Sequence, residues 1–289
     1  MEFTNEKGYP GWIAKGLSYS TYNRDGIKFD ISATKLIDSP QIAQFWREHG
    51  KDVVEDVSDR VWSAWGSATH AVFEEANTAN PDVLMEKRFL SEYQGKVVAG
   101  QIDCYEVPTK TLSDIKTSGS FKVTKGDYQQ WENQLNVCAQ LMRDNGYEVE
   151  RLQIVALVKD WSAYKADKEK DYPADPVTII DIPMWTEETA KGYINERVDM
   201  HFSDGPKQCS DADRWVRKGR YAVMKKGRKS AVRLVDSEEE AHSYIKWAKL
   251  EGDEKISIVE RKAQYVRCDN YCAFSKLGVC QQHLGANNG

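Results

Sequence analysis

Two aspartates stand in the stretch VVAGQIDCYEVPTKTLSDIKTS, which covers residues 97–118. Asp103 and Asp114 each lie in a run of residues that otherwise favours a β-strand, and a proline-containing turn separates the two runs. If residues 107–110 form this turn, Glu106 pairs with Thr111 and Asp103 lies directly opposite Asp114. Opposed residues share a face of the sheet, with Cβ atoms about 4.5–5.5 Å apart. Two carboxylates at that distance must share a proton or hold a cation between them.

Lys116 follows Asp114 by two residues, so the alternation of strand side chains sends it to the same face. Carboxylate oxygens are the ligands that Mg²⁺ prefers, and a bound divalent cation activates water and stabilises charge on a phosphoryl oxygen. A nearby lysine can orient or help deprotonate that water, or neutralise the transition state. The pattern therefore fits metal-dependent phosphodiester hydrolysis. It also fits a surface hairpin with scattered charges, so the rest of the chain must decide.

Two further polar residues lie in predicted helices on either side of the hairpin. His70 lies upstream in GSATHAVFE, with Glu74 four residues later on the same helix face. A single histidine next to apolar residues such as Phe73 is often structural. Gln134 lies downstream in QWENQLNVCAQL, on a helix that could pack beside the hairpin.

Three cysteines gather near the end of the chain in RCDNYCAFSKLGVCQQH: Cys268, Cys272 and Cys280. Clustered cysteines in a chain without secretory features point to metal binding rather than disulfides. Two residues could complete the ligand set. His283 would give a Cys3His zinc site, whereas Cys209 would give the four thiolates of a [4Fe–4S] cluster. We treat either group as structural rather than redox-active.

A basic stretch covers residues 207–233, where ten Lys or Arg residues accompany two Asp residues. The whole chain has a net charge of −5, so the remainder is strongly acidic. Such asymmetry indicates a surface that faces a polyanion, although charge runs are often only solvated turns. Trp215 and Tyr221 could stack on unpaired bases. The expected phosphate contacts are Lys218, Arg220, Lys225, Lys226, Arg228 and Lys229.

The periodicity of the chain predicts an α/β fold with a mixed central β-sheet flanked by helices. We expect strands at residues 84–90, 96–106, 111–117, 151–161 and 177–184, and helices within residues 32–49, 56–76, 127–146 and 186–202. Residues 1–205 would form this core with its N-terminal helices. Residues 206–289 would form a basic ββαβ module followed by the cysteine-rich tail.

No apolar run approaches the roughly 20 residues that span a bilayer. The N-terminal stretch MEFTNEKGYPGW has no basic region followed by an apolar one, which argues against a secretory signal. We therefore expect a soluble cytoplasmic protein with no membrane partner.

The motifs GSATHAVFE, GQID, SDIKTS and NQLNVCAQL, in this order, resemble those of RecB-type nucleases in the PD-(D/E)XK superfamily, over about residues 28–160. With the cysteine tail, the chain is more similar to the iron–sulfur subgroup, which includes CRISPR-associated RecB-like exonucleases and phage exonucleases. The stretches DVSDRVWSAWGSATH and YAVMKKGRKSAVRLVDSEEEA look most like the phage-encoded branch. A phage protein would act in the host cytoplasm.

The resemblance implies a role for each matching residue. His70, Asp103, Asp114 and the Ile115 carbonyl would hold Mg²⁺ or Mn²⁺, and Lys116 would be the catalytic lysine. Gln134 would contact DNA or position the lysine. The tyrosine that the family has four residues later is Cys138 here, which puts any tyrosine contact to DNA in doubt. The subgroup also implies the [4Fe–4S] cluster on Cys209, Cys268, Cys272 and Cys280.

The function that follows is a DNA nuclease of phage-type recombination, repair or replication, with exonuclease action on single strands or DNA ends favoured. Metal-activated water would attack the phosphodiester in line and release the 3′ oxygen. Relatives of this kind can be oligomeric and can work with an annealing or single-strand-binding protein. The alternatives are a non-catalytic DNA-binding recombination scaffold that retains the fold and cluster, and an iron–sulfur electron carrier.

Overall fold

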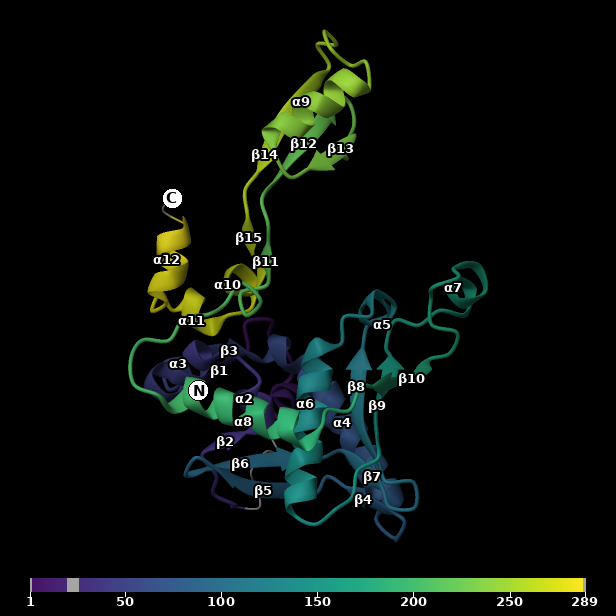
Figure 1. Cartoon of the computed structure of the whole chain (residues 1–289), viewed down its shortest axis with the longest axis vertical. Coiled ribbons are helices and arrows are strands. Elements are labelled where there is room, and N and C mark those ends of the chain that lie inside the picture. The colour runs from purple at the N-terminus through teal and green to yellow at the C-terminus, as the bar shows by residue number, and fades with distance from the viewer. Residues whose placement is uncertain (1, 20–25, 288–289) are drawn as a thin grey trace. The chain divides into compact units, whose positions relative to one another are not determined.

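The computed structural model describes residues 2–19 and 26–287 (Figure 1). The chain divides into two compact units, Met1–Lys207 and Gln208–Gly289, called here the N-terminal and C-terminal units. In the described residues, no helix is both long and apolar enough to cross a membrane.

A five-stranded mixed sheet forms the centre of the N-terminal unit. Its strands lie in the order β10 (Val177–Ile182), β9 (Arg151–Val158), β8 (Thr111–Ser118), β7 (Cys104–Glu106) and β4 (Val83–Met85). Strands β8 and β9 are parallel, and the other neighbouring pairs are antiparallel. Alternate residues of β9, beginning at Leu152, are buried, as the period of a strand requires. The predicted mixed α/β fold is confirmed.

A second sheet contains β2 (Ile31–Ser32), β6 (Lys96–Gln101) and β5 (Arg88–Tyr93), in that order. Gln94 and Gly95 join β5 to β6 and both have positive φ, 51° and 71°, as the favoured two-residue hairpin turns require. The strands predicted at 84–90 and 96–106 are present, but each is divided into two strands by a short gap. Each run changes sheets part-way, so that β4 leads into β5 and β6 leads into β7.

The main core of this unit lies between the sheets and the helices α2 (Ala33–Leu36), α6 (Gln129–Asp144) and α8 (Glu187–Phe202). Helix α6 buries Leu135, Cys138 and Met142, which recur at helical spacing. Gly146, with φ of 83°, follows its end, and a left-handed glycine commonly terminates a helix. Thr186 caps α8 by accepting a hydrogen bond from the Thr189 amide.

Helix α4 (Val61–Asn77) carries His70 and lies against β8 and β4. It follows the short helix η1 (Val57–Arg60), and none of its 17 residues is buried. The remaining elements of the unit are β1 (Glu2–Thr4), which pairs with β3 (Val54–Asp56), and the helices α1 (Gly11–Ser18), α3 (Pro40–His49), α5 (Ser120–Lys125) and α7 (Ala163–Lys168). In Figure 1, β8 runs directly toward α5.

The C-terminal unit contains the predicted ββαβ module. Strands β13 (Arg233–Val235), β12 (Arg220–Lys225) and β14 (Ile256–Arg261) form one antiparallel sheet, with α9 (Glu238–Trp247) between β13 and β14 in the chain. Ser237 caps α9 by accepting from the Glu240 amide at 3.1 Å. A short ladder of β11 (Val216–Arg217) and β15 (Gln264–Tyr265) leads to α10 (Val266–Asn270), α11 (Ala273–Lys276) and α12 (Gln281–Asn287).

Candidate active site

The site begins where the long antiparallel hairpin changes from one sheet to the other. Met85 pairs with Cys104 on one side of the bend, and Arg88 pairs with Gln101 on the other. Between these pairs, the Glu86 amide donates to the Asp103 carbonyl at 3.1 Å. The register therefore runs unbroken through the bend and places Glu86 directly opposite Asp103.

Asp103 also lies at the end of the pairing between β7 and β8. Glu106 faces Thr111, as predicted, and the ladder stops at Cys104 and Ser113, one step before Asp103 would face Asp114. Beyond the end of this backbone ladder, the Asp103 side chain still connects to β8, because its Oδ2 accepts a hydrogen bond from the Ile115 amide at 2.7 Å. One buried carboxylate thus joins the bend to the strand that carries Asp114 and Lys116.

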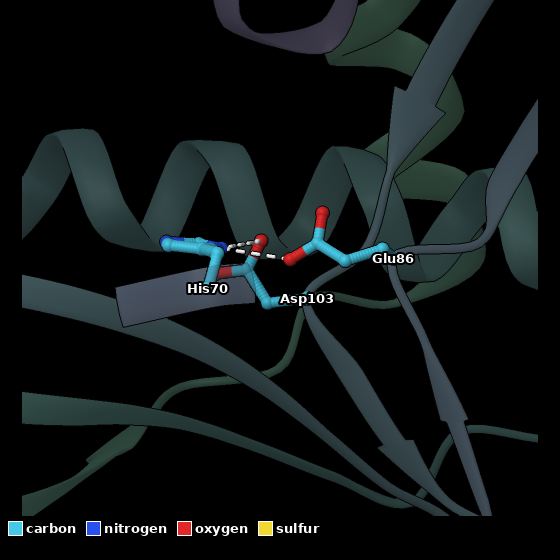
Figure 2. Close-up of side chains that lie close together, drawn as sticks. All are labelled: His70, Glu86 and Asp103. Atoms are coloured by element: carbon cyan, nitrogen blue, oxygen red, sulfur yellow. Dashed lines mark hydrogen bonds and ion pairs between the residues drawn. The ribbon is translucent and has the colours of Figure 1, made fainter. Parts of the chain in front are cut away.

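His70, Glu86 and Asp103 form what we call the carboxylate–histidine cluster. The Nδ1 atom of His70 lies 2.8 Å from Glu86 Oε1 and 3.6 Å from Asp103 Oδ1, and Figure 2 shows both contacts reaching the same ring. Gln101 donates to the second Glu86 oxygen at 2.7 Å. Each of the three residues offers one potential ligand atom, and these three atoms lie within 4.8 Å of one another. In the described ranges 2–19 and 26–287, no other set of three acidic, histidine or cysteine side chains converges in this way.

Sequence reasoning missed Glu86, although the chain contained a signal for it. Counting back from a two-residue turn at Gln94 and Gly95 pairs Tyr93 with Lys96 and, further along the same hairpin, Glu86 with Asp103. Glu74, the acidic neighbour that the helix pattern suggested, is exposed and is not part of the cluster.

Asp114, Lys116 and Gln134 form a second group, called here the lysine group. The Lys116 ammonium lies 2.6 Å from Asp114 Oδ2 and 3.4 Å from Gln134 Oε1. The Gln134 amide donates to Asp114 Oδ1 at 3.0 Å. Both Asp114 oxygens are thus engaged by the lysine group, so Asp114 stands beside the carboxylate–histidine cluster rather than in it.

The electrostatics of the site favour a bound cation. Burial raises the pKa of Asp103 to about 7, and repulsion from Asp114 adds to the effect against the attraction of His70 and Lys116. The hydrogen bond to Glu86 raises the pKa of His70, and Asp103 acts in the same direction, against burial. The His70 proton therefore helps to neutralise crowded carboxylates, which a metal ion could do instead.

Lys116 is held as a cation. Burial alone would lower the pKa of Lys116, but the attraction of Asp114 and Asp103 outweighs it, and the pKa is raised. The side chain is therefore an ammonium at neutral pH and cannot readily accept a proton from water.

The donor set suits a hard divalent cation. Two carboxylates and an imidazole are available in the carboxylate–histidine cluster, and Mg²⁺ and Mn²⁺ prefer oxygen-rich sites. Asp114 could join them only by giving up a contact to Lys116 or Gln134. Ile115 is buried beside the cluster, with its amide bound to Asp103. Cys138, at the family's tyrosine position, is buried in the core against Gly100.

The cysteines of the tail interact within the C-terminal unit. Burial raises the pKa of the Cys268 thiol, Arg214 opposes this, and Cys272 and Cys280 raise the pKa further. The Cys209 amide donates to Gln282 Oε1 at 3.0 Å, and the Gln282 amide donates back to the Cys209 carbonyl at 2.8 Å. Gln282 is two residues from Cys280, so these bonds place the backbone of Cys209 beside this part of the tail. Within residues 2–19 and 26–287, no three cysteine sulfurs lie within 4.8 Å of one another.

The basic residues around the β12–β13 hairpin differ in their surroundings. Arg220 donates to Asp236 at 2.9 Å, and the Lys225 ammonium lies 3.6 Å from Asp253. Gly227, with φ of 89°, lies in the loop after β12, and this loop also carries Lys226, Arg228 and Lys229. Lys218 is exposed just before β12.

No protein-family model and no curated protein sequence matches the chain. Among solved structures, SSO0001 is 18% identical with a TM-score of 0.45, and the match covers 67% of this chain and 86% of that one. A candidate exonuclease from Eubacterium rectale is 15% identical with a TM-score of 0.33, covering 60% of this chain and 67% of that one. Both are distant neighbours, so the function must be argued from the geometry of the site.

Proposed function

We propose that this chain is a metal-dependent DNA nuclease, acting as an exonuclease on strand ends in recombination, repair or replication. The convergence of His70, Glu86 and Asp103 within 4.8 Å carries this proposal. One of these ligands comes from helix α4 and two come from facing residues in the bend of one hairpin, beside a partly buried lysine–aspartate pair. A hairpin with scattered surface charges would not need this arrangement.

The carboxylate–histidine cluster would hold Mg²⁺ or Mn²⁺, with Asp114 as a further carboxylate at its side. A cation bound there would supply Lewis acidity toward the scissile phosphate and would lower the pKa of a water molecule. Asp103 fixes the cluster against β8 through the Ile115 amide. Gln101 orients Glu86 and leaves its other oxygen directed at His70.

Lys116 supplies positive charge where the attacked phosphate becomes more negative. Because its pKa is raised, it stabilises this charge or orients the water, and it does not serve as the general base. Gln134 positions Lys116 by bonding to it and to Asp114. The exposed loop residues of the β12–β13 hairpin would add contacts to DNA phosphates that do not depend on sequence.

The four cysteines Cys209, Cys268, Cys272 and Cys280 would hold a structural [4Fe–4S] cluster, with zinc on the three tail cysteines and His283 as the alternative. The bonds between Gln282 and Cys209 support the four-cysteine set, because they bring residue 209 beside the tail. Anaerobic purification followed by a visible spectrum tests this choice. Iron–sulfur charge transfer gives a brown protein, whereas a zinc protein is colourless, and metal analysis distinguishes zinc from an empty site.

The nuclease proposal is tested with end-labelled single- and double-stranded DNA in Mg²⁺, Mn²⁺ or EDTA. We expect hydrolysis that requires the metal and is lost in Lys116→Ala. A wild-type protein that binds DNA without cutting it would support the non-catalytic scaffold instead. Equal cutting by the wild type and Lys116→Ala would remove the assigned site.

A further inference from the structure

Helix α4 exposes a pair of stacked tryptophans near its start. The rings of Trp62 and Trp65 lie 5.7 Å apart with 18° between their planes, and the two residues are 57% and 50% exposed. The Lys159 ammonium lies 3.8 Å from the centre of the Trp62 ring. Removing such large apolar rings from water would ordinarily stabilise the fold, yet these rings remain exposed to water.

The aromatic pair lies on the same helix as His70 of the carboxylate–histidine cluster, nearer the N-terminus of α4. Trp62 precedes His70 by eight residues, or about 12 Å of helix at 1.5 Å per residue. Between them, a Cβ added to Gly66 would lie 3.7 Å from the Thr117 hydroxyl, so α4 runs close to the residue that follows Lys116.

Lys159 is contributed by the central sheet and lies beside the Trp62 ring. It directly follows β9, and its amide donates to the Ser118 carbonyl at 2.9 Å. Ser118 is two residues beyond Lys116 at the end of β8. The two tryptophans and Lys159 thus lie near the C-terminal end of β8, the strand that contains Asp114 and Lys116.

We propose that Trp62, Trp65 and Lys159 form a stacking platform for the unpaired strand that enters the site. Aromatic rings bind single strands because every base has a face for stacking, whereas the bases of an intact duplex expose only their edges. A cation beside the rings suits the phosphates that link the stacked bases. This inference rests on the proposed nuclease function and adds to it a preference for unpaired DNA.

The test measures the binding of a fluorescein-labelled oligothymidylate, and of a duplex of the same length, by anisotropy across a range of salt concentrations in EDTA. Full-length protein carrying Lys116→Ala serves as the parent, so that no substrate is consumed. We expect Trp62→Ala and Trp65→Ala each to weaken single-strand binding by about fivefold or more, with the salt dependence unchanged. Lys159→Gln should instead make the slope of log K against log salt shallower by about 0.7.

Two further variants keep the test decisive. Trp62→Phe retains an aromatic ring and should recover much of the affinity, whereas Val72→Ala, at a 66% exposed position of the same helix, should bind like the parent. Unchanged single-strand affinity in the double tryptophan variant overturns the proposal. Equal losses for single strand and duplex also overturn it, as would a double variant that dissociates an oligomer without altering DNA affinity.

Failure of the platform is distinguishable from failure of the nuclease proposal. If the wild type cuts DNA in Mg²⁺ and the tryptophan variants bind and cut single strands normally, only the platform is wrong. If single-strand binding depends on the tryptophans but the wild type never cuts DNA, the platform stands and the nuclease proposal fails.

Discussion

Glu86 and Asp103 face each other across the bend of one hairpin, and their carboxylates reach the same nitrogen of His70, at 2.8 and 3.6 Å. Glu86 achieves this with a φ of 49°, in the left-handed region that side chains other than glycine rarely adopt. That conformation costs about 1–2 kcal/mol. The Glu86 amide and carboxylate each make a hydrogen bond that holds it there.

Replacing Glu86 tests whether it belongs to the metal site. Glu86→Gln keeps the size of the side chain and removes its charge, so the cluster loses one anionic donor. We expect Mn²⁺ affinity, measured by calorimetry, to fall by at least about ten- to hundredfold, together with activity at limiting metal. Glu74→Gln, on the exposed side chain of α4, is the matched control and should bind Mn²⁺ normally. Equal affinity in Glu86→Gln and the wild type would exclude Glu86 as a ligand.

Of the two strand pairings that place Asp103, only the pairing with the strand of Asp114 and Lys116 was predictable from the sequence. The residues between Glu106 and Thr111 fix the length of one turn, and period-two alternation then places Lys116 with Asp114. The opposite partner, Glu86, required the turn at Gln94 and Gly95 and the recognition that pairing continues through a bend between two sheets. Strand propensity alone does not mark such a bend, because both halves of each run still favour strand.

Helix α4 shows a second limit of sequence reasoning. Its apolar residues recur at helical spacing, and this pattern predicted the helix correctly. The same pattern ordinarily indicates a buried face, yet Trp62, Trp65 and Val72 are all more than a third exposed. Periodicity identifies which residues share a face and does not reveal what, if anything, covers that face.

Lys116 should contribute to turnover and not to metal binding. Lys116→Ala removes a cation that competes with the metal for Asp114, so Mn²⁺ affinity should stay the same or rise. Hydrolysis should fall by about 10²–10³-fold, as expected for loss of a charge that stabilises the transition state. Single-turnover cleavage and Mn²⁺ calorimetry on the same preparation measure both effects. A loss of Mn²⁺ affinity in proportion to the loss of rate would show that Lys116 only maintains the cluster.

Metal uptake should release protons near neutral pH. Asp103 has a pKa raised to about 7, and the pKa of His70 is also raised. Both groups must be deprotonated to act as ligands, so apparent affinity should increase as the pH rises through about 7. Calorimetry at pH 6.5 in two buffers with different ionisation heats measures the protons released. Asp103→Asn should lower that number, and identical heats in the two buffers would contradict the assignment.

The β12–β13 loop should contribute electrostatic affinity for DNA. Lys226→Gln combined with Lys229→Gln should weaken duplex binding and make the salt slope shallower by about 1 to 2, because each phosphate that a lysine neutralises adds about 0.9 to the slope. Arg220→Gln is the comparison, because Arg220 is already bound to Asp236 and should matter less. If the double variant kept both affinity and slope, the loop would not be a DNA-binding surface.

His201 should make the N-terminal unit sensitive to acid. The residue is 1% exposed, and its imidazole lies 3.0 Å from the Leu36 carbonyl. Burial lowers the pKa of His201 from 6.5 to about 4, with Arg197 and Arg47 acting in the same direction. Between pH 6.5 and pH 4 the imidazole of residue 201 binds a proton in the unfolded chain but not in the folded chain. The contribution of neutral His201 to the free energy of unfolding is therefore full above about pH 6.5 and is lost as the pH falls toward 4. The pKa difference corresponds to about 3 kcal/mol.

His201→Gln should remove this dependence, because a neutral amide can donate to Leu36 at any pH. Urea unfolding at several pH values between 4 and 7 should show the wild type losing its advantage over the variant as acid is added. Parallel curves for wild type and His201→Gln would mean that His201 is not the buried group that titrates.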